Sequence, residues 1–132
     1  MNAYCLMNHQ LTAAQENELI HRYGAERIVF PPAGISSAWM NIPVEAVLKR
    51  SSVSPFLTWI DSIPPSSAVV LQGEAGASFA LIDYALRRNL VVLHSVTERK
   101  ASEARRGEIV TRKYEFEHVC FREYHRIEEL SV

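Results

Sequence analysis

The feature that most constrains the fold is a pair of short, continuously apolar segments on either side of one helix-length segment. Residues 68–71 and 90–95 are the apolar segments, and residues 78–88 between them carry apolar side chains over a wide face. Strands of a parallel sheet that is covered on both faces have such uninterrupted apolar runs. A strand, a helix and a second parallel strand form a right-handed crossover unit. The sequence therefore predicts an α/β fold with a mostly parallel sheet flanked by helices.

Two further strands are predicted before this unit. Residues 3–7 form one short apolar run, and residues 27–30 form another that is ended by Pro31-Pro32. Proline has no N–H to donate to a strand ladder, so it favours the end of a strand. Both segments are short enough to be buried strands of the same sheet.

Helices are expected between these strands. Thr12 and Gln15 have the spacing of a capping box, which predicts a helix running to about Tyr23, where Gly24 ends it. Further along the chain, helical pieces are expected over residues 44–49 and 55–60, joined by a serine-rich turn at Ser51-Ser52, and residues 33–43 are expected to be irregular or at most a short helix.

The C-terminal part has a different pattern. Residues 108–111 and 113–123 alternate in a two-residue rhythm that predicts an antiparallel hairpin or edge strands added to the sheet. Tyr114, Phe116, His118 and Cys120 are expected on one face, with Val119 and Phe121 on the other. Residues 97–107 are polar and charged and are expected to form a loop. The chain has no internal repeat and no long linker, so we expect one domain over residues 1–132.

Composition narrows the classes of function. Hydrophobic residues make up 48% and charged residues 22%, which is typical of a globular protein. The net charge of -1 argues against a protein that coats long nucleic acid, because such binding needs many cations to displace counterions. No signal peptide or membrane segment is apparent, so we expect a cytoplasmic protein. Cys5 and Cys120 are expected to be small buried hydrophobes rather than metal ligands, and we expect no metal and no cofactor.

Polar residues follow three of the predicted strands. Asn8-His9 follows the first, Gln72-Gly73-Glu74 follows the strand at 68–71, and Ser95 to Lys100 follows the next. Ligands of open parallel sheets bind outside the carboxyl ends of the strands. Because these ends lie on the same edge, we expect the three polar groups to converge.

The turn from Gly73 to Gly76 has two interpretations. Glycines let backbone N–H groups approach a phosphate at a helix N-terminus, but glycine is also the default residue of any tight turn. The Walker and dinucleotide fingerprints are absent. Glu74 would repel a phosphate placed against it, so we expect its carboxylate to bond a ribose hydroxyl or to position another side chain.

Four other residues have both a functional and a structural interpretation. Arg99 and Lys100 are the best phosphate ligands in the sequence, because arginine offers a fork of donors and lysine a point charge. The alternative is a solvated loop of mixed charge. His9 can act as an acid or base near neutral pH, or it can cap a helix. Trp39 can stack on a base, although a core position is more usual.

Taken in order, several segments resemble one known family. The match covers nearly the whole chain and departs from the family at Glu74, where aspartate is usual, and at Val96, where a polar residue is usual. The segments are Asn8-His9-x-Leu11-Thr12-x-x-Gln15, Trp39-x-Asn41-Ile42-Pro43, Leu71-Gln72-Gly73-Glu74-x-Gly76-Ala77, Thr97-x-Arg99 and Phe116-x-His118-Val119-x-Phe121-Arg122-x-Tyr124. The chain thus resembles the small, stand-alone CRISPR-associated proteins of type III systems that are grouped with the ancillary ring nucleases.

The resemblance implies a CARF-like, Rossmann-like fold and a homodimer that binds a cyclic oligoadenylate second messenger. It also implies metal-independent cleavage of that messenger, most simply cyclic tetra-adenylate, by a ribose 2′-hydroxyl. His9 and Arg99 would be the catalytic residues. The ligand-binding residues would be Asn8, Gln72, Gly73, Glu74, Gly76, Thr97 and Lys100. The alternatives are a sponge or sensor that binds the messenger without turnover, and an interaction protein without a nucleotide ligand.

Overall fold

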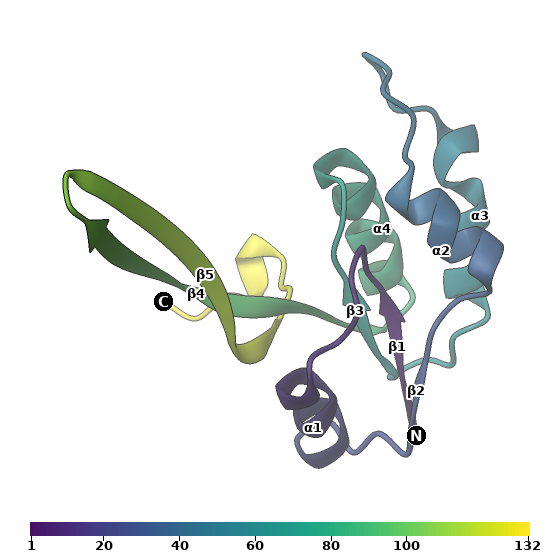
Figure 1. Ribbon diagram of the computed structural model, residues 1–132. Coiled ribbons are helices and arrows are strands. Elements are labelled where there is room, and N and C mark those ends of the chain that lie inside the picture. Colours follow the sequence, from purple (N-terminus) through teal and green to yellow (C-terminus); the bar gives the residue numbers. More distant parts are fainter.

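The computed structural model describes residues 1–132 as a five-stranded sheet with helices on both faces (Figure 1). The strand order is β2-β1-β3-β4-β5, in which β5 alone is antiparallel to its neighbour. The strands are β1 (Asn2–Leu6), β2 (Arg27–Val29), β3 (Ala68–Leu71), β4 (Val91–Arg106) and β5 (Ile109–Glu123). The helices are α1 (Ala13–His21), α2 (Ala33–Met40), α3 (Arg50–Asp61), α4 (Ala75–Arg87) and the 3-10 helix η1 (Ile127–Glu129). The predicted α/β fold with a mostly parallel sheet and a C-terminal antiparallel hairpin is confirmed.

Alternation along the strands divides the core into two clusters. Val69, Leu71 and Val92 face a cluster built with α2, α3 and α4. Val70 and Leu93 face the other side, where they pack with α1. All five side chains are buried, as expected for strands covered on both faces. The molecule is therefore a three-layer sandwich in which α1 alone covers one face of the sheet. None of the helices is both long enough and apolar enough to cross a membrane.

The predicted start of α1 is confirmed in detail. The Thr12 hydroxyl accepts from the Gln15 backbone N–H, and the Gln15 side chain accepts from the Thr12 N–H, so the capping box is complete. After the helix, Gly24 adopts a left-handed φ of 68°, which glycine reaches without a steric penalty. The free thiols of Cys5 and Cys120 are buried and half-buried, respectively.

The prediction for residues 44–60 is wrong in two respects. Residues 44–49 are not helical, because Val44 and Val47 lie in solvent and have no apolar face to bury. The helix α3 begins at Arg50 and includes the two serines that were expected to form a turn. Burial of Val53 and the apolar residues that follow it at helical spacing outweighs the weak helix propensity of serine.

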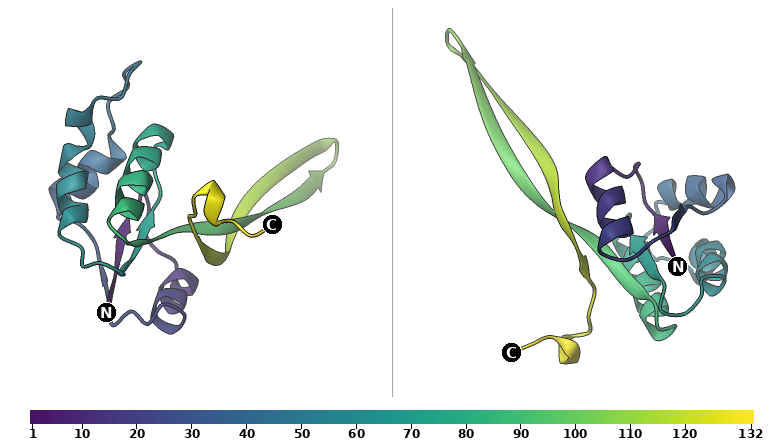
Figure 2. Two further views of the ribbon diagram at one scale, coloured as in Figure 1. Left: turned by 180° about the vertical axis from the view of Figure 1, so that it is seen from behind. Right: turned by 90° about the horizontal axis from the view of Figure 1, so that it is seen from below.

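The expected loop at residues 97–107 is also wrong. These residues continue β4, which pairs with β5 down to Arg106 opposite Ile109. The turn has two residues, and Gly107 at its first position has a φ of 60°, as a type II′ hairpin turn requires. Residues 97–117 are all exposed, so this half of the hairpin has no buried face and no apolar alternation to reveal it. We call residues 97–118 the arm; Figure 2 shows it projecting from the body of the molecule.

A β-bulge at the base of the arm corrects the predicted faces of β5. Cys120 lies opposite Val96 and His118 opposite Thr97, which leaves Val119 as the extra residue. As a result, the rings of His118 and Phe121 lie 4.7 Å apart and face α1 together, although they are three positions apart in sequence. A regular two-residue alternation had placed them on opposite faces.

Candidate functional site at the carboxyl edge of the sheet

The chain reverses the direction of its connections between β1 and β3. The connection from β1 to β2 uses α1 on one face, whereas β2 reaches β3 through α2 and α3 on the other. Such a switch point leaves a crevice outside the carboxyl ends of the two strands, where open α/β sheets bind ligands. The Gln72 backbone N–H donates to the Leu6 carbonyl oxygen at 3.1 Å, so the segments that follow β1 and β3 leave the sheet side by side.

The segment after β1 presents Asn8 and His9 to solvent. The Nδ1 atom of His9 lies 3.2 Å from the Gln10 carbonyl oxygen. His9 lines a cavity of about 390 Å³ together with Leu11 and Phe30. The imidazole is thus accessible at the edge where it was predicted, with only a local backbone contact.

Gly73 has a structural role that the sequence does not reveal. The indole Nε1–H of Trp39 donates to the Gln72 carbonyl oxygen at 2.9 Å. The indole lies directly against Gly73. A Cβ atom on Gly73 would lie 2.6 Å from three atoms of that ring. Trp39 itself is 1% exposed and meets Phe56 edge-to-face, so its core interpretation is confirmed. Gly73 is required here by the close approach of the indole.

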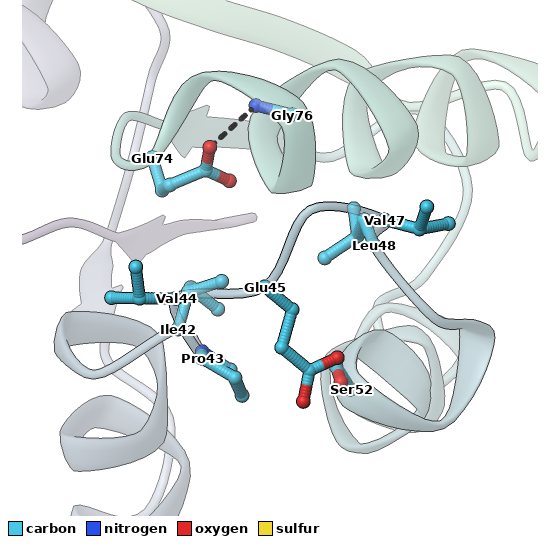
Figure 3. Close-up of a pocket in the computed structure, with 9 residues that line it drawn as sticks. All are labelled: Ile42, Pro43, Val44, Glu45, Val47, Leu48, Ser52, Glu74 and Gly76. Atoms are coloured by element: carbon cyan, nitrogen blue, oxygen red, sulfur yellow. Dashed lines mark hydrogen bonds between the residues drawn. The ribbon is translucent and has the colours of Figure 1, made fainter.

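Glu74 occupies the N-terminus of α4 with its own carboxylate. The two oxygens accept from the backbone N–H groups of Ala77 at 2.8 Å and Gly76 at 3.1 Å. Figure 3 shows the bond from Gly76. These two bonds, that from Ala77 foremost, lower the pKa of the carboxyl group. The donors that a phosphate would use at this helix end are therefore already taken, and Gly76 contributes its N–H to the cap.

Two cavities flank this cap. One, of about 260 Å³, lies between Glu74 and the Ile42–Leu48 segment (Figure 3). The other, of about 400 Å³, lies between the end of β3, the start of α4 and Tyr124. In its wall, Gln72 Oε1 and Ser78 Oγ are buried without a hydrogen-bond partner. Buried polar atoms are rarely unpaired, and these two could bond the hydroxyl or amine groups of a ligand that displaces the atoms covering them.

The switch-point edge of a single chain does not include Thr97, Arg99 and Lys100. They lie on the arm, and Arg99 is four residues beyond Ser95, roughly 13 Å at the rise of an extended strand. The expected convergence of three strand ends is therefore wrong for the third, because β4 continues past the sheet. The register also separates the two cations. Arg99 lies over the Tyr114 ring at 4.7 Å, whereas Lys100 lies on the opposite face and pairs with Glu117 at 2.5 Å.

The sequence did not predict a cluster of hydrogen-bonded polar side chains that joins α1 to the base of the arm. Ser95 Oγ lies 2.5 Å from His118 Nδ1, and His118 Nε2 lies 2.7 Å from Glu18 Oε1. The Phe121 N–H and the Arg22 guanidinium also donate to Glu18. Burial raises the pKa of the Glu18 carboxyl, but these hydrogen bonds outweigh burial and lower it.

A serine, a histidine and a carboxylate in series can serve nucleophilic catalysis. None of Ser95, His118 and Glu18 lines a cavity described above, however, and the His118 side chain is only 6% exposed. The arrangement holds the arm to the body. One hundred residues separate Glu18 from His118, so no local spacing could reveal the contact.

Comparison with known proteins gives one clear assignment. No solved structure matches the chain. A protein described as "Uncharacterized protein MJ1673", from Methanocaldococcus jannaschii, is 27% identical over 123 residues, which cover 92% of this chain and 95% of that protein. The family described as the "Uncharacterized protein MJ1673 family" matches residues 1–122. The chain therefore belongs to the MJ1673 family.

Proposed function

We propose that this protein is a metal-independent ring nuclease that cleaves a cyclic oligoadenylate, with cyclic tetra-adenylate as the first candidate, and so switches off type III CRISPR signalling. One observation carries the proposal. Five residues from the segments that carry the family resemblance gather at two places, the switch-point edge and one face of the arm. Asn8, Gln72 and Gly73 lie at the first, and Thr97 and Arg99 lie at the second.

The switch-point edge has the chemistry to hold an adenine nucleoside. Gln72 Oε1 accepts hydrogen bonds, and Ser78 Oγ both donates and accepts them. Their cavity of about 400 Å³ is within the size range of small-molecule sites. Because Glu74 fills the end of α4, the phosphates would lie away from this helix and near His9. Arg99 lies roughly 13 Å beyond this edge within one chain, so the arm of a second copy, in the expected homodimer, would have to bring its cations to the phosphates.

The reaction would need only positioning and proton transfer. The ribose O2′ attacks the neighbouring phosphorus in line, the P–O5′ bond breaks, and the products carry a 2′,3′-cyclic phosphate and a 5′-hydroxyl. The O2′ proton is lost to a base and O5′ gains one proton, so no water is consumed. His9 would transfer protons, and Arg99 would stabilise the charge that develops on the phosphate oxygens.

The decisive experiment is incubation of the purified protein with cyclic tri-, tetra- and hexa-adenylate in EDTA, with chromatography of the products. We expect one ring size to yield linear products ending in a cyclic phosphate. Arg99→Ala should lower the rate at least about 100-fold, and His9→Ala should lower it by a similar factor. Lys113→Ala is the matched control, because it removes an exposed cation from the other face of the arm. Full turnover by Arg99→Ala would remove this residue from the mechanism.

A second candidate function is a sponge or sensor that binds the messenger without cleaving it. The observation in its favour is that the switch-point edge has few side chains that can transfer protons. His9 is the one histidine on the loop after β1. Recovery of intact ligand that co-elutes with the protein would support this candidate. If none of the three rings shifts the melting temperature, an interaction protein without a nucleotide ligand becomes the better account.

A further inference from the structure

We propose that one face of the arm binds a short single-stranded nucleic acid, with arginines on its phosphates and aromatic rings stacked on its unpaired bases. The inference goes beyond the proposed function, because it requires neither a cyclic messenger nor its cleavage. We call this side of the arm the arginine face. It carries Arg99, Arg105, Arg112, Tyr114 and Phe116, together with Glu103.

The register divides the charges of the arm unequally between its two faces. Residues directly opposite each other in an antiparallel pair share a face, and so do alternate residues of one strand. The arginine face therefore has three cations and one anion. The other face has as many anions as cations, namely Glu98, Glu115 and Glu117 with Lys100, Arg106 and Lys113. The excess of positive charge lies on one face only, and a polyanion would be attracted to that face.

Two of the three arginines on this face are free to contact phosphates. Arg112 pairs with Glu103 at 2.9 Å, which uses the one carboxylate of the arginine face. Arg99 and Arg105 form no ion pair, and both are exposed. A guanidinium group offers a planar fork of N–H donors that matches two phosphate oxygens. The arginine face can therefore hold at least two phosphates without breaking an existing ion pair.

Exposed aromatic rings lie among these arginines. Phe116 is 70% and Tyr114 50% exposed, and the two lie two positions apart on β5, roughly 7 Å along the strand. The guanidinium carbon of Arg99 lies 4.7 Å from the centre of the Tyr114 ring, and Arg99 is opposite Phe116. Unpaired bases stack on aromatic rings and on guanidinium planes, and sheets that bind single-stranded RNA use exposed aromatic residues in this way. A duplex keeps its bases stacked inside, and an acidic peptide has no bases, so the rings favour an unpaired strand.

The size of the arginine face limits the length of the bound strand. The distance along β4 from Arg99 to Arg105 is roughly 20 Å at the rise of an extended strand, which gives room for a few nucleotides. The arm projects from the body, so a strand can lie along this face without meeting the helices (Figure 2). A short strand also agrees with the net charge of -1, which argues against the coating of long nucleic acid.

The test is fluorescence anisotropy of a labelled deca-uridylate strand titrated with the whole chain in EDTA and low salt. We expect a Kd of roughly 1–100 μM that rises with salt concentration. Arg105→Glu should weaken binding roughly 10-fold, because it places a negative charge beside the phosphates. Arg106→Glu is the matched control, since it makes the same change at the next residue, which is also exposed but lies on the other face. This control should bind within about twofold of the wild type.

A second pair of variants tests the stacking. Phe116→Ala should weaken binding roughly 5- to 150-fold, the range for loss of one base–aromatic stack. Ile109→Ala is its control, because Ile109 is 69% exposed on the same arm but on the other face, and it should bind like the wild type. The same strand annealed to its complement should bind more weakly than the free strand, because its bases are no longer available. Circular dichroism checks that each variant remains folded.

Three results would overturn the inference. The first is the absence of binding in the micromolar range, and the second is an equal loss from Arg105→Glu and Arg106→Glu. The third is binding that Phe116→Ala leaves unchanged, because the face would then attract any polyanion, an acidic peptide included. The failure of the proposed function is separate. A protein that binds uridylate but leaves every cyclic oligoadenylate intact argues against the nuclease alone, and cleavage without uridylate binding argues against the arginine face alone.

Discussion

At the scale of single residues, Gly73 and Glu74 show how a motif can combine structural and functional demands. Both were predicted to bind a ligand from their place after β3. The structure gives each a local role, since Gly73 makes room for the Trp39 indole and Glu74 caps α4. Neither role excludes contact with a ligand, because both residues are exposed at the edge of the sheet.

Gly73→Ala should destabilise the protein by about 1–3 kcal/mol, because the new methyl group overlaps the Trp39 ring and buried side chains resist displacement. The measurement is urea unfolding followed by tryptophan fluorescence. Gly34→Ala is the control, since a Cβ there meets nothing within 4 Å and the residue lies in α2. It should be neutral or slightly stabilising. Equal stability of the two variants would contradict the packing role of Gly73.

Local signals made several residues predictable. The Thr12 capping box and the left-handed Gly24 depend on neighbours within a few positions, so the sequence alone identifies them. The contact between Trp39 and Gly73 joins residues 34 positions apart, and nothing near either one predicts it. The unpaired Gln72 Oε1 likewise becomes visible only when its surroundings are known.

At the scale of elements, α1 is tied to the base of the arm through one carboxylate. Glu18 accepts from His118, from the Phe121 N–H and from Arg22, and its side chain is 14% exposed. This joins the helix to both sides of the bulge at Val119. The bulge is what allows His118 and Phe121 to face α1 together, so the tie depends on an irregularity that alternation could not predict.

Glu18→Gln should cost about 1.5–3 kcal/mol of unfolding free energy at pH 7, because charge-assisted hydrogen bonds to a nearly buried group are lost. The folded-state pKa of Glu18 is lowered, so its stabilisation is present above the pKa of the unfolded chain and is lost as the pH falls through the lowered folded value. The difference between wild type and variant should therefore be constant from pH 7 to about pH 5.5 and shrink toward pH 3.

Urea titrations at several pH values measure this difference. The control is Glu16→Gln, an exposed residue of the same helix, which should change stability by less than about 0.5 kcal/mol. If the gap between wild type and Glu18→Gln widens on acidification, the sign of the pKa shift is wrong.

The elements divide clearly into predictable and unpredictable ones. The strand at 68–71 is an apolar run buried on both faces, β1 is mostly buried, and β2 is a short edge strand that is at most half-buried. Each lies within a residue or two of its predicted bounds. The outer part of β4 has no buried face, so its residues have the composition of a loop. Pairing with β5 alone makes it a strand, and such pairing is a contact between distant residues rather than a local preference.

At the scale of the whole molecule, the body and the arm are separable. Neither buried cluster contains a residue of the arm. The sequence predicted the body well apart from residues 44–60, because the two faces of the sheet require apolar side chains in most of its elements. It did not predict how far the arm extends, and so it placed three groups of polar residues at one edge where the structure places two.

Replacing residues 99–116 with an Asn-Gly turn should leave the body folded. Glu98 and Glu117 already pair across the hairpin, so a two-residue turn can close it there. We expect the unfolding free energy to differ by less than about 1 kcal/mol from that of the full chain, measured by urea unfolding and circular dichroism. Loss of a cooperative transition would show that the arm supports the body after all. Cleavage of cyclic oligoadenylate should be abolished, since Arg99 is removed.

The separation has a consequence for how this sequence can diversify. Along the arm beyond its base, over residues 99–116, no side chain belongs to either buried cluster, so substitutions there are filtered mainly by what the residues meet outside their own chain. A saturation scan should therefore find arm positions where substitutions leave cellular abundance unchanged but lower activity, concentrated on the face that carries Thr97 and Arg99. The molecules that the arm contacts can therefore change during evolution without any loss of stability of the fold.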